Sequence, residues 1–375
     1  MIGRALLLIL VLGCANSFGQ HTETDRSEWI IGDPAKAGFD VEALDQLTKD
    51  IKAGDTNTHA VLIEHAGTLV YEQYFEGTDE RRGRRITRLM DKDSLHDLRS
   101  ATKGVTSALL GIALADNLKD DDFKRAVARP IGEYLTDLEF GEKQREITLH
   151  HVLTMTSGLE WSQRGSYRDN PDNDALRLYR VRNPSQYALS RPVIHEPGTK
   201  WNYNTGCSSM LGDVILKLSG QTIDDFARER LFGPLGIRSF EWFEADIWET
   251  GNPAGGSGLR LTARDLAKIG SVYLHGGKWR GKQVVPAKWV ELSTVRHSRD
   301  AGWMSGGDIW GYGYHWKVGK LPSGEDAIAA AGNGNQRVFV FPKERIAVTI
   351  FAGQYNLPFE PHSEMITKQI LESRR

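Results

Sequence analysis

The sequence predicts an α+β protein in which one antiparallel sheet is built from both ends of the chain and flanked by helices. Segments that alternate and are rich in β-forming residues occur towards the two ends, at residues 59–77 and 311–354. Segments with apolar residues at helical spacing fill the middle, between about residues 100 and 294. We therefore expect the two terminal regions to share one sheet and the middle of the chain to form an inserted, mostly helical lobe.

The elements follow in order along the chain. Residues 39–54 predict a surface helix that ends on glycine, and residues 59–77 predict a hairpin that turns at 65–67. A buried helix begins near Ser100. Further helical patterns cover residues 130–135, 147–159, 208–220, 222–237, 262–277 and 286–294; β-rich segments cover 311–319, 326–333, 336–343 and 346–354; and residues 363–375 close the chain as a helix.

Composition predicts a globular protein with ample material for a core. The chain has 375 residues, 40% hydrophobic and 26% charged, with a formal net charge of −2. The charged run "DERRGRR" (79–85) is interpreted as a solvated loop, so we expect no nucleic-acid partner. We expect one domain over residues 20–375, with a sheet lobe at about 28–100 and 260–375 and a helical lobe at about 101–259. Nothing in the sequence indicates an oligomeric state.

The first 20 residues, "MIGRALLLILVLGCANSFGQ", predict an export signal over residues 1–19. Arg4 precedes a short apolar run, which is followed by small residues. Two kinds of processing remain open: ordinary cleavage before Gln20, which is slightly favoured, or a lipoprotein-type site that would leave a lipid anchor on Cys14. We expect a periplasmic or secreted protein that contacts a membrane only through such an anchor.

No metal or organic cofactor is expected. Cys14 and Cys207 are the two cysteines, too few for a cysteine-based zinc site, and ordinary cleavage would leave Cys207 without a disulfide partner. The adjacent His150 and His151 are interpreted as structural. The polar segment 161–174 is interpreted as a surface loop, with a lid over the site as the alternative.

The chemistry is suggested first by "HDLRSATKGVTSALLGIALADN" (96–117). Ser100 and Lys103 are three residues apart, so both side chains lie on one helix face. A buried lysine is costly unless it is used or paired, and a lysine whose pKa is lowered by burial can take the proton of a serine nucleophile. Ser-x-x-Lys by itself occurs by chance, so it is the position of the motif at the start of a buried helix that indicates a nucleophile and its base.

Two other stretches could complete a site. Tyr203 stands on a loop before the next buried helix, where a tyrosine could relay a proton, although a half-buried packing role is the simpler interpretation. The small residues that begin "AAAGNGNQRVFVFP" (329–342) leave room for a substrate backbone to approach, or they form a simple glycine turn.

Taken together, five stretches resemble the serine hydrolases of the β-lactamase class C group, which includes penicillin-binding-protein-like esterases and 6-aminohexanoate-dimer hydrolases. They are "SATKGVTSALLGIAL", "ITLHHVLTMTSGL", "PGTKWNYNTGCSSMLG", "SGLRLTARDLAKIG" and "AGNGNQRVFVFPK", in this order, and the resemblance runs from about Asp33 to the C-terminal helix. The "WNYNTG" form is most similar to the dimer-hydrolase branch. The resemblance implies a β-lactamase/transpeptidase-like fold and cleavage of a small-molecule ester or amide without a cofactor.

The same resemblance implies roles for particular residues. Ser100 would be acylated, Lys103 would accept its proton, and Tyr203 would act with the lysine as general base and acid. The backbone N–H groups of Ser100 and Asn333 would form the oxyanion hole. Ala331 and Gly332 would belong to the strand edge along which the substrate lies.

Departures from the family pattern leave alternatives. Thr205 stands where the family has asparagine after Tyr-x, and Ala330–Ala331–Gly332 replaces Lys-Thr-Gly, which removes a cation and a hydroxyl that hold a carboxylate. D-alanyl peptidase or β-lactamase activity would need another group such as Arg337, although an arginine there is expected at the surface. A non-catalytic acyl-binding or sensor protein is a second alternative. An ordinary α/β-hydrolase is excluded because the chain has no Gly-x-Ser-x-Gly.

Overall fold

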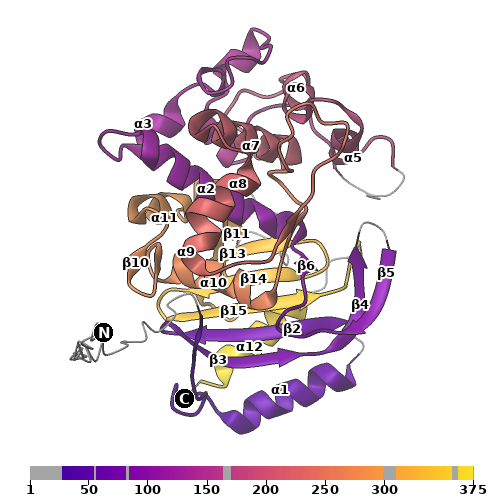
Figure 1. Cartoon of the computed structure of the whole chain (residues 1–375), viewed down its shortest axis with the longest axis vertical. Helices are drawn as coiled ribbons and strands as arrows, with labels where there is room; N and C mark the ends of the chain where they lie inside the picture. The colour runs from indigo at the N-terminus through magenta and orange to yellow at the C-terminus, as the bar shows by residue number, and fades with distance from the viewer. Residues whose placement is uncertain are drawn as a thin grey trace, which may run out of the picture.

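One eight-stranded sheet crosses the molecule in the computed structural model, which describes residues 28–54, 56–81, 84–163, 170–298, 310–356 and 362–374 (Figure 1). The strand order is β1-β3-β2-β15-β14-β13-β12-β11. Its strands are β1 (Ile30–Ile31), β2 (Thr58–His65), β3 (Thr68–Tyr74), β11 (Trp310–Tyr312), β12 (Lys317–Lys320), β13 (Asp326–Gly332), β14 (Gln336–Phe341) and β15 (Ile346–Ala352).

Both ends of the chain build this sheet, as the sequence predicts. β2 from the N-terminal region pairs antiparallel with β15 from the C-terminal region, with Val61 opposite Ile350. All the neighbouring pairs are antiparallel except β1 and β3. The expected α+β architecture is therefore confirmed, whereas the division into two lobes at about residues 100 and 260 stays a prediction.

The helices cover the two faces of the sheet unequally (Figure 1). The α-helices are α1 (Val41–Ala53), α2 (Thr102–Asn117), α3 (Phe123–Ala128), α4 (Leu149–Leu153), α5 (Asp174–Arg177), α6 (Pro184–Leu189), α7 (Thr205–Ser219), α8 (Ile223–Ala227), α9 (Gly233–Leu235), α10 (Ala263–Leu274), α11 (Ala287–Ser293) and α12 (His362–Glu372). α1 and α12 pack on one face, and α2 and α10 lie on the other.

Alternation along β14 shows how one strand serves both faces. Val338 and Val340 belong to the core beneath α2 and α10, whereas Phe339 and Phe341 belong to the core beneath α1 and α12. Successive side chains of a strand point to opposite faces, so a strand covered on both sides reads as a continuous apolar run.

The interpretation of residues 79–85 as a solvated loop is wrong in two respects, because the described residues form a hairpin and Asp79 and Glu80 are buried, whereas Arg81, Arg84 and Arg85 are exposed as expected. β4 (Glu76–Arg81) and β5 (Arg84–Leu89) form an antiparallel hairpin. Asp79 is 3% exposed, accepts a hydrogen bond from the Tyr355 hydroxyl at 2.8 Å and lies 3.5 Å from the Arg88 guanidinium. Charge runs are usually solvated, but here basic and acidic residues pair across the hairpin and with the body of the protein, so part of the run is buried.

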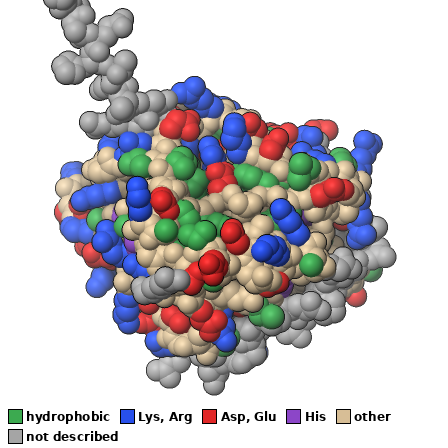
Figure 2. Space-filling view, turned by 90° about the horizontal axis from the view of Figure 1, so that it is seen from below, with side chains coloured by type: hydrophobic (Ala, Val, Ile, Leu, Met, Phe, Trp, Pro, Cys, Tyr) green, Lys and Arg blue, Asp and Glu red, His purple; other side chains and the backbone are tan. Residues whose placement is uncertain are grey.

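The surface carries charges of both signs. Figure 2 shows basic and acidic side chains interspersed over the face that is seen from below in Figure 1. Among the described residues, no helix is long and apolar enough to span a bilayer. The predicted signal at 1–19, with Cys14, lies outside the described residues and stays a prediction, and so does the lid alternative for 161–174, of which residues 164–169 lie outside them.

A substitution inside α2 tests this packing. A Cβ at Gly111 would come within 2.3 Å of the Trp289 ring, which is fully buried, so Gly111→Ala is expected to lower the free energy of unfolding by about 1–3 kcal/mol. Gly212→Ala on α7 is the matched control, because its Cβ would meet ordinary contacts at 3.5 Å and the helix would gain propensity. Urea denaturation measures both, and equal stability of the two variants would contradict the packing.

Candidate active site

Ser100 lies at the joint between a short strand and the central helix. β6 (His96–Asp97) pairs with β8 (Leu259–Leu261), and a 3-10 turn (Arg99–Ala101) then leads into α2. Ser100 is partly exposed, on the first turn that the sequence predicts. The Ser100 hydroxyl therefore lies at the N-terminus of a buried helix, near backbone N–H groups that have no partner within the helix.

The residue before the serine has an unfavourable backbone conformation. Arg99 has φ +50°, in the left-handed region, and its N–H donates to the Asp97 carboxylate at 2.8 Å. Non-glycine residues adopt this conformation at a cost of about 1–2 kcal/mol. Such a conformation persists where the surroundings fix it, and here it turns the chain sharply from β6 into α2.

Lys103 is held beside the serine. Its Nζ lies 3.4 Å from Ser100 Oγ and donates to the Gly256 carbonyl at 2.7 Å. The side chain is buried, with only 1% of the residue exposed, and burial lowers the pKa of Lys103 to about 7, against a smaller raising effect of Cys207. A large share of the amine is therefore neutral near pH 7, with a lone pair that can accept the Ser100 proton while an N–H stays on Gly256.

Gly256 is part of the site but was not among the residues singled out from the sequence. A Cβ on it would lie 2.9 Å from the Ser208 and Thr205 side chains and 3.3 Å from Lys103 Nζ. Only glycine lets the backbone come close enough for its carbonyl to reach the buried amine. The available signal was the glycine-rich stretch 255–258, directly before the buried strand β8.

The ring of Tyr203 lies close to the lysine amine. Lys103 Nζ is 5.0 Å from the centre of the Tyr203 ring. Trp201 packs against that ring at 6.1 Å, and the Asn204 side chain caps α7 by accepting from the Cys207 N–H at 3.1 Å. The loop before α7 thus brings the tyrosine to the same amine that faces Ser100.

The end of β13 approaches the serine turn. β12 pairs with β13 only from Asp326 to Ala329, which leaves the next three residues, 330–332, without that neighbour. A Cβ on Gly332 would lie 2.2 Å from the Leu98 carbonyl oxygen, so the strand packs directly against the chain that precedes Ser100. The side chain of Asn333 exchanges hydrogen bonds with Asn356, at 2.7 and 2.9 Å.

Arg337 is not at the surface, contrary to expectation. It is 3% exposed, and its Nη1 donates to the Gly332 carbonyl at 2.6 Å. The arginine shares the sheet face of Phe339, beneath α1 and α12, because residues two apart on a strand lie on one face. A guanidinium in this place does not replace the missing lysine and threonine as a grip on a substrate carboxylate.

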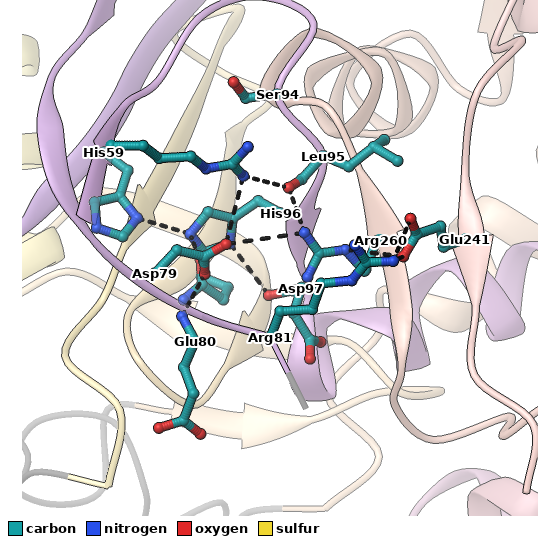
Figure 3. A network of polar contacts seen from close by, with 12 residues as sticks. His59, Asp79, Glu80, Arg81, Ser94, Leu95, His96, Asp97, Glu241 and Arg260 are labelled. Atoms are coloured by element: carbon teal, nitrogen blue, oxygen red, sulfur yellow. Dashed lines mark hydrogen bonds and ion pairs between the residues drawn. The ribbon is translucent and has the colours of Figure 1, made fainter. Parts of the chain in front are cut away.

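A polar network supports the strand before the serine (Figure 3). His59 Nδ1 lies 2.8 Å from His96 Nε2, which lies 3.5 Å from Asp79 Oδ1. Arg88 and Arg260 both donate to the Leu95 carbonyl, at 3.0 and 2.7 Å, and both lie within 4 Å of the Asp79 carboxylate. The network thereby ties β6 to the β4–β5 hairpin and to β8.

The same cluster is the one group of His, Cys, Asp and Glu side chains in the described part of the chain whose spacing could hold a metal ion. His59, Asp79 and His96 are all buried. Two nitrogens bound to tetrahedral zinc lie about 3.3 Å apart, whereas these are at hydrogen-bonding distance. Because Arg88 and Arg260 already face Asp79, we interpret the cluster as structural support.

A pocket of about 390 Å³ adjoins the serine turn. Asp97 at the end of β6 and Arg99 on the serine turn line it on one side. Ser257 and Gly258, directly after Gly256, line it as well. Its other lining side chains include the aromatic Tyr179, Trp242 and Phe243. Charged side chains line it as well, among them Arg81, Glu241 and Arg260. Ser100 itself does not line the pocket, which offers a mixed aromatic and charged space beside the serine turn.

Comparison with known proteins agrees with this geometry. The family model described as Beta-lactamase matches residues 44–365, so the chain belongs to the beta-lactamase family. A protein of Escherichia coli O157:H7, provisionally named a D-alanyl-D-alanine carboxypeptidase, is 21% identical over 80% of each chain. Esterase EstB of Burkholderia gladioli is 28% identical over 50% of this chain and 47% of its own length.

Solved structures show the same fold. The structure of a Bacillus anthracis protein, provisionally titled a 6-aminohexanoate-dimer hydrolase, superposes with a TM-score of 0.68 and 21% identity, covering 92% of this chain and 86% of that one. The expected β-lactamase-like fold and family are confirmed, and the chain is an enzyme of this hydrolase family.

Burial of the Lys103 amine is expected to lower the stability of the folded protein at neutral pH. Lys103 has a pKa near 7 when folded and near 10.5 when unfolded, so unfolding is favoured by proton uptake below pH 10.5. Lys103→Met is expected to melt several degrees above wild type at pH 7, with the difference shrinking as the pH rises towards 10. Melting curves across this pH range measure it, and a variant less stable than wild type at pH 7 would contradict the burial penalty.

Proposed function

We propose that the protein is a serine hydrolase that cleaves an ester or amide bond in a small molecule through an acyl-enzyme on Ser100. The observation that carries the proposal is the contact between Ser100 Oγ and the buried Lys103 amine, whose pKa of about 7 suits a general base at neutral pH. Membership of the beta-lactamase family supports it, as does the likeness to a named esterase.

In the acylation step, neutral Lys103 takes the proton of the Ser100 hydroxyl as Oγ attacks the substrate carbonyl carbon. The carbonyl electron pair moves onto oxygen, and the backbone N–H groups of Ser100 and Asn333 stabilise this oxyanion. When the pair returns, the bond to the leaving group breaks, and the leaving group takes a proton from Lys103 through Tyr203. Ser100 is then esterified, and the lysine is neutral again.

Water completes the cycle. It attacks the acyl carbon and gives a proton to the Lys103–Tyr203 pair, and the second oxyanion collapses with release of Ser100 Oγ, which takes that proton back. The acid product leaves, and the enzyme returns to its starting state. The steps use no metal and no organic cofactor. The edge of Ala331 and Gly332 provides the surface along which the substrate lies.

Loss of the serine is the first test. Ser100→Ala is expected to lose essentially all turnover of short-chain p-nitrophenyl esters and aminohexanoate dimers, and all labelling by a fluorophosphonate probe, while it stays folded. Lys103→Ala should be nearly as damaging, and Tyr203→Phe somewhat less so, because residues that act together are non-additive. Ser94→Ala, at an exposed turn before the same helix, is the matched control. A folded Ser100→Ala protein with wild-type turnover would refute the proposal, whereas a folded wild-type protein that neither labels nor turns over substrate would favour a binding function.

The pH dependence of kcat/KM tests the base. Lys103 must be neutral to take the serine proton, so kcat/KM for an uncharged ester is expected to rise with pH and to level off above about pH 7. A stopped assay between pH 5 and 9 measures the profile. Rates that are flat or fall over this range would show that another group, or none, removes the proton.

We also propose that the chain is exported and matures by removal of its first residues. The short apolar run after Arg4 supports this. Intact mass of the protein from envelope and secreted fractions distinguishes a mature chain that begins at Gln20 from one with a lipid on Cys14. A full-length cytoplasmic chain would refute export.

A further inference from the structure

We propose that Arg337 is a positioning residue for the oxyanion hole: from the far face of the sheet it holds the Gly332 carbonyl, and so aims the Asn333 N–H at the carbonyl of a substrate on Ser100. The inference rests on the proposed function and adds to it a residue that never touches substrate.

One edge of β13 is open at the end of the strand. Its partner β12 ends opposite Ala329, so nothing in that strand pairs with Ala330–Gly332. On its other side, β13 stays paired with β14 as far as Gly332, opposite Gln336. α2 and the serine turn pack against β13 (Figure 1), and Gly332 lies against the Leu98 carbonyl. The end of β13 therefore lies beside the serine turn.

Arg337 orients the peptide between Gly332 and Asn333. Arg337 Nη1 donates to the Gly332 carbonyl at 2.6 Å and to the Gln336 carbonyl at 3.1 Å, so the Gly332 oxygen faces a side chain that comes from β14. No described peptide bond is cis, and in a planar trans peptide the C=O and the following N–H point in opposite directions. With the Gly332 oxygen turned towards β14, the Asn333 N–H is turned away from β14, over the open edge.

Arg337 also brings a positive charge to the Gly332 carbonyl. Arg337 is a buried cation, and burial lowers its pKa while the buried Glu364 carboxylate on α12 counteracts this. A charge-assisted bond to a carbonyl is stronger than a neutral one, and it polarises the amide so that its N–H becomes a better donor. The cation therefore strengthens the Asn333 N–H at a distance, in addition to fixing its direction.

The turn after Gly332 is fixed by other contacts as well. Asn333 and Asn356 bond each other, and Ser363 at the start of α12 donates to the Asn335 side chain at 3.1 Å. These contacts hold the side chains of the turn, whereas Arg337 acts on the backbone peptide that carries the Asn333 N–H. Removing the arginine should therefore loosen one peptide without unfolding the hairpin.

The experiment compares Arg337→Gln and Arg337→Lys with wild type in turnover of a p-nitrophenyl ester and in the rate of fluorophosphonate labelling of Ser100. The oxyanion forms only in the transition state, so Arg337→Gln should lower kcat and the labelling rate together by about 10- to 100-fold, with KM within about 2-fold of wild type. Arg337→Lys keeps the charge but not the fixed geometry of the guanidinium, so it should recover part of that loss and leave kcat severalfold below wild type.

Arg264→Gln is the matched control, because it removes an arginine that pairs with Glu72 on β3, away from the serine turn. It should leave kcat unchanged. A folded Arg337→Gln variant with wild-type kcat would overturn the inference, and so would a loss confined to KM or one that Arg264→Gln shares. If the glutamine variant does not fold, the lysine variant carries the test: kcat reduced severalfold at constant KM supports the inference, and wild-type kcat overturns it.

The behaviour of the wild-type protein distinguishes failure of the Arg337 inference from failure of the hydrolase function. Labelling and turnover at Ser100 in wild type, with unchanged rates in the Arg337 variants, would refute the role of Arg337 and leave the hydrolase function standing. A wild-type protein that neither labels nor turns over any ester would refute the hydrolase function and this inference together.

Discussion

The contact on which the site depends is the hydrogen bond from Lys103 to the Gly256 carbonyl. It gives a buried amine one fixed acceptor, and a neutral amine then has its lone pair free for the Ser100 hydroxyl, 3.4 Å away. The contact exists only because the Gly255–Gly256 backbone comes against α2, where Thr106 also donates to the Gly255 carbonyl at 2.6 Å. Three distant parts of the chain therefore meet at one nitrogen: α2, the loop before α7 and the segment before β8.

The sheet supplies the other half of the site. Gly332 packs on the Leu98 carbonyl, and Leu98 donates its own N–H to Leu259 at 2.9 Å, so the chain before the serine is fixed between β13 and β8. The buried His59–Asp79–His96 cluster anchors β6, and the surrounding structure can therefore hold Arg99 in its unfavourable conformation. The Ser100 hydroxyl thus stands on a strained turn that is supported on both sides.

Much of the fold could be predicted from the sequence, because local patterns carry it. Alternation predicts the strands, and the spacing of apolar residues predicts α1, α2, α7 and α10. α1 buries one face, whereas α2 is buried on all sides from Thr102 to Leu114. The hairpin expected to turn at 65–67 turns at Ala66–Gly67. Two interpretations failed for one reason. The charged run at 79–85 and Arg337 were both assigned to the surface, whereas Asp79 is buried against Tyr355 and Arg337 is buried near Glu364 of α12, and both partners are distant in the chain.

The sequence by itself determined the class of fold, the serine–lysine pair one helical turn apart and the tyrosine that belongs with them, because spacing on a helix and order of motifs are properties of the chain. Only the tertiary structure decided the pKa of Lys103, the part played by Gly256 and the contact of Arg337 with the Gly332 carbonyl. Burial, a backbone carbonyl brought from about 150 residues away and a guanidinium on the far face of a sheet are long-range effects. No local pattern of residue types encodes them, since they arise only when the separate segments pack together.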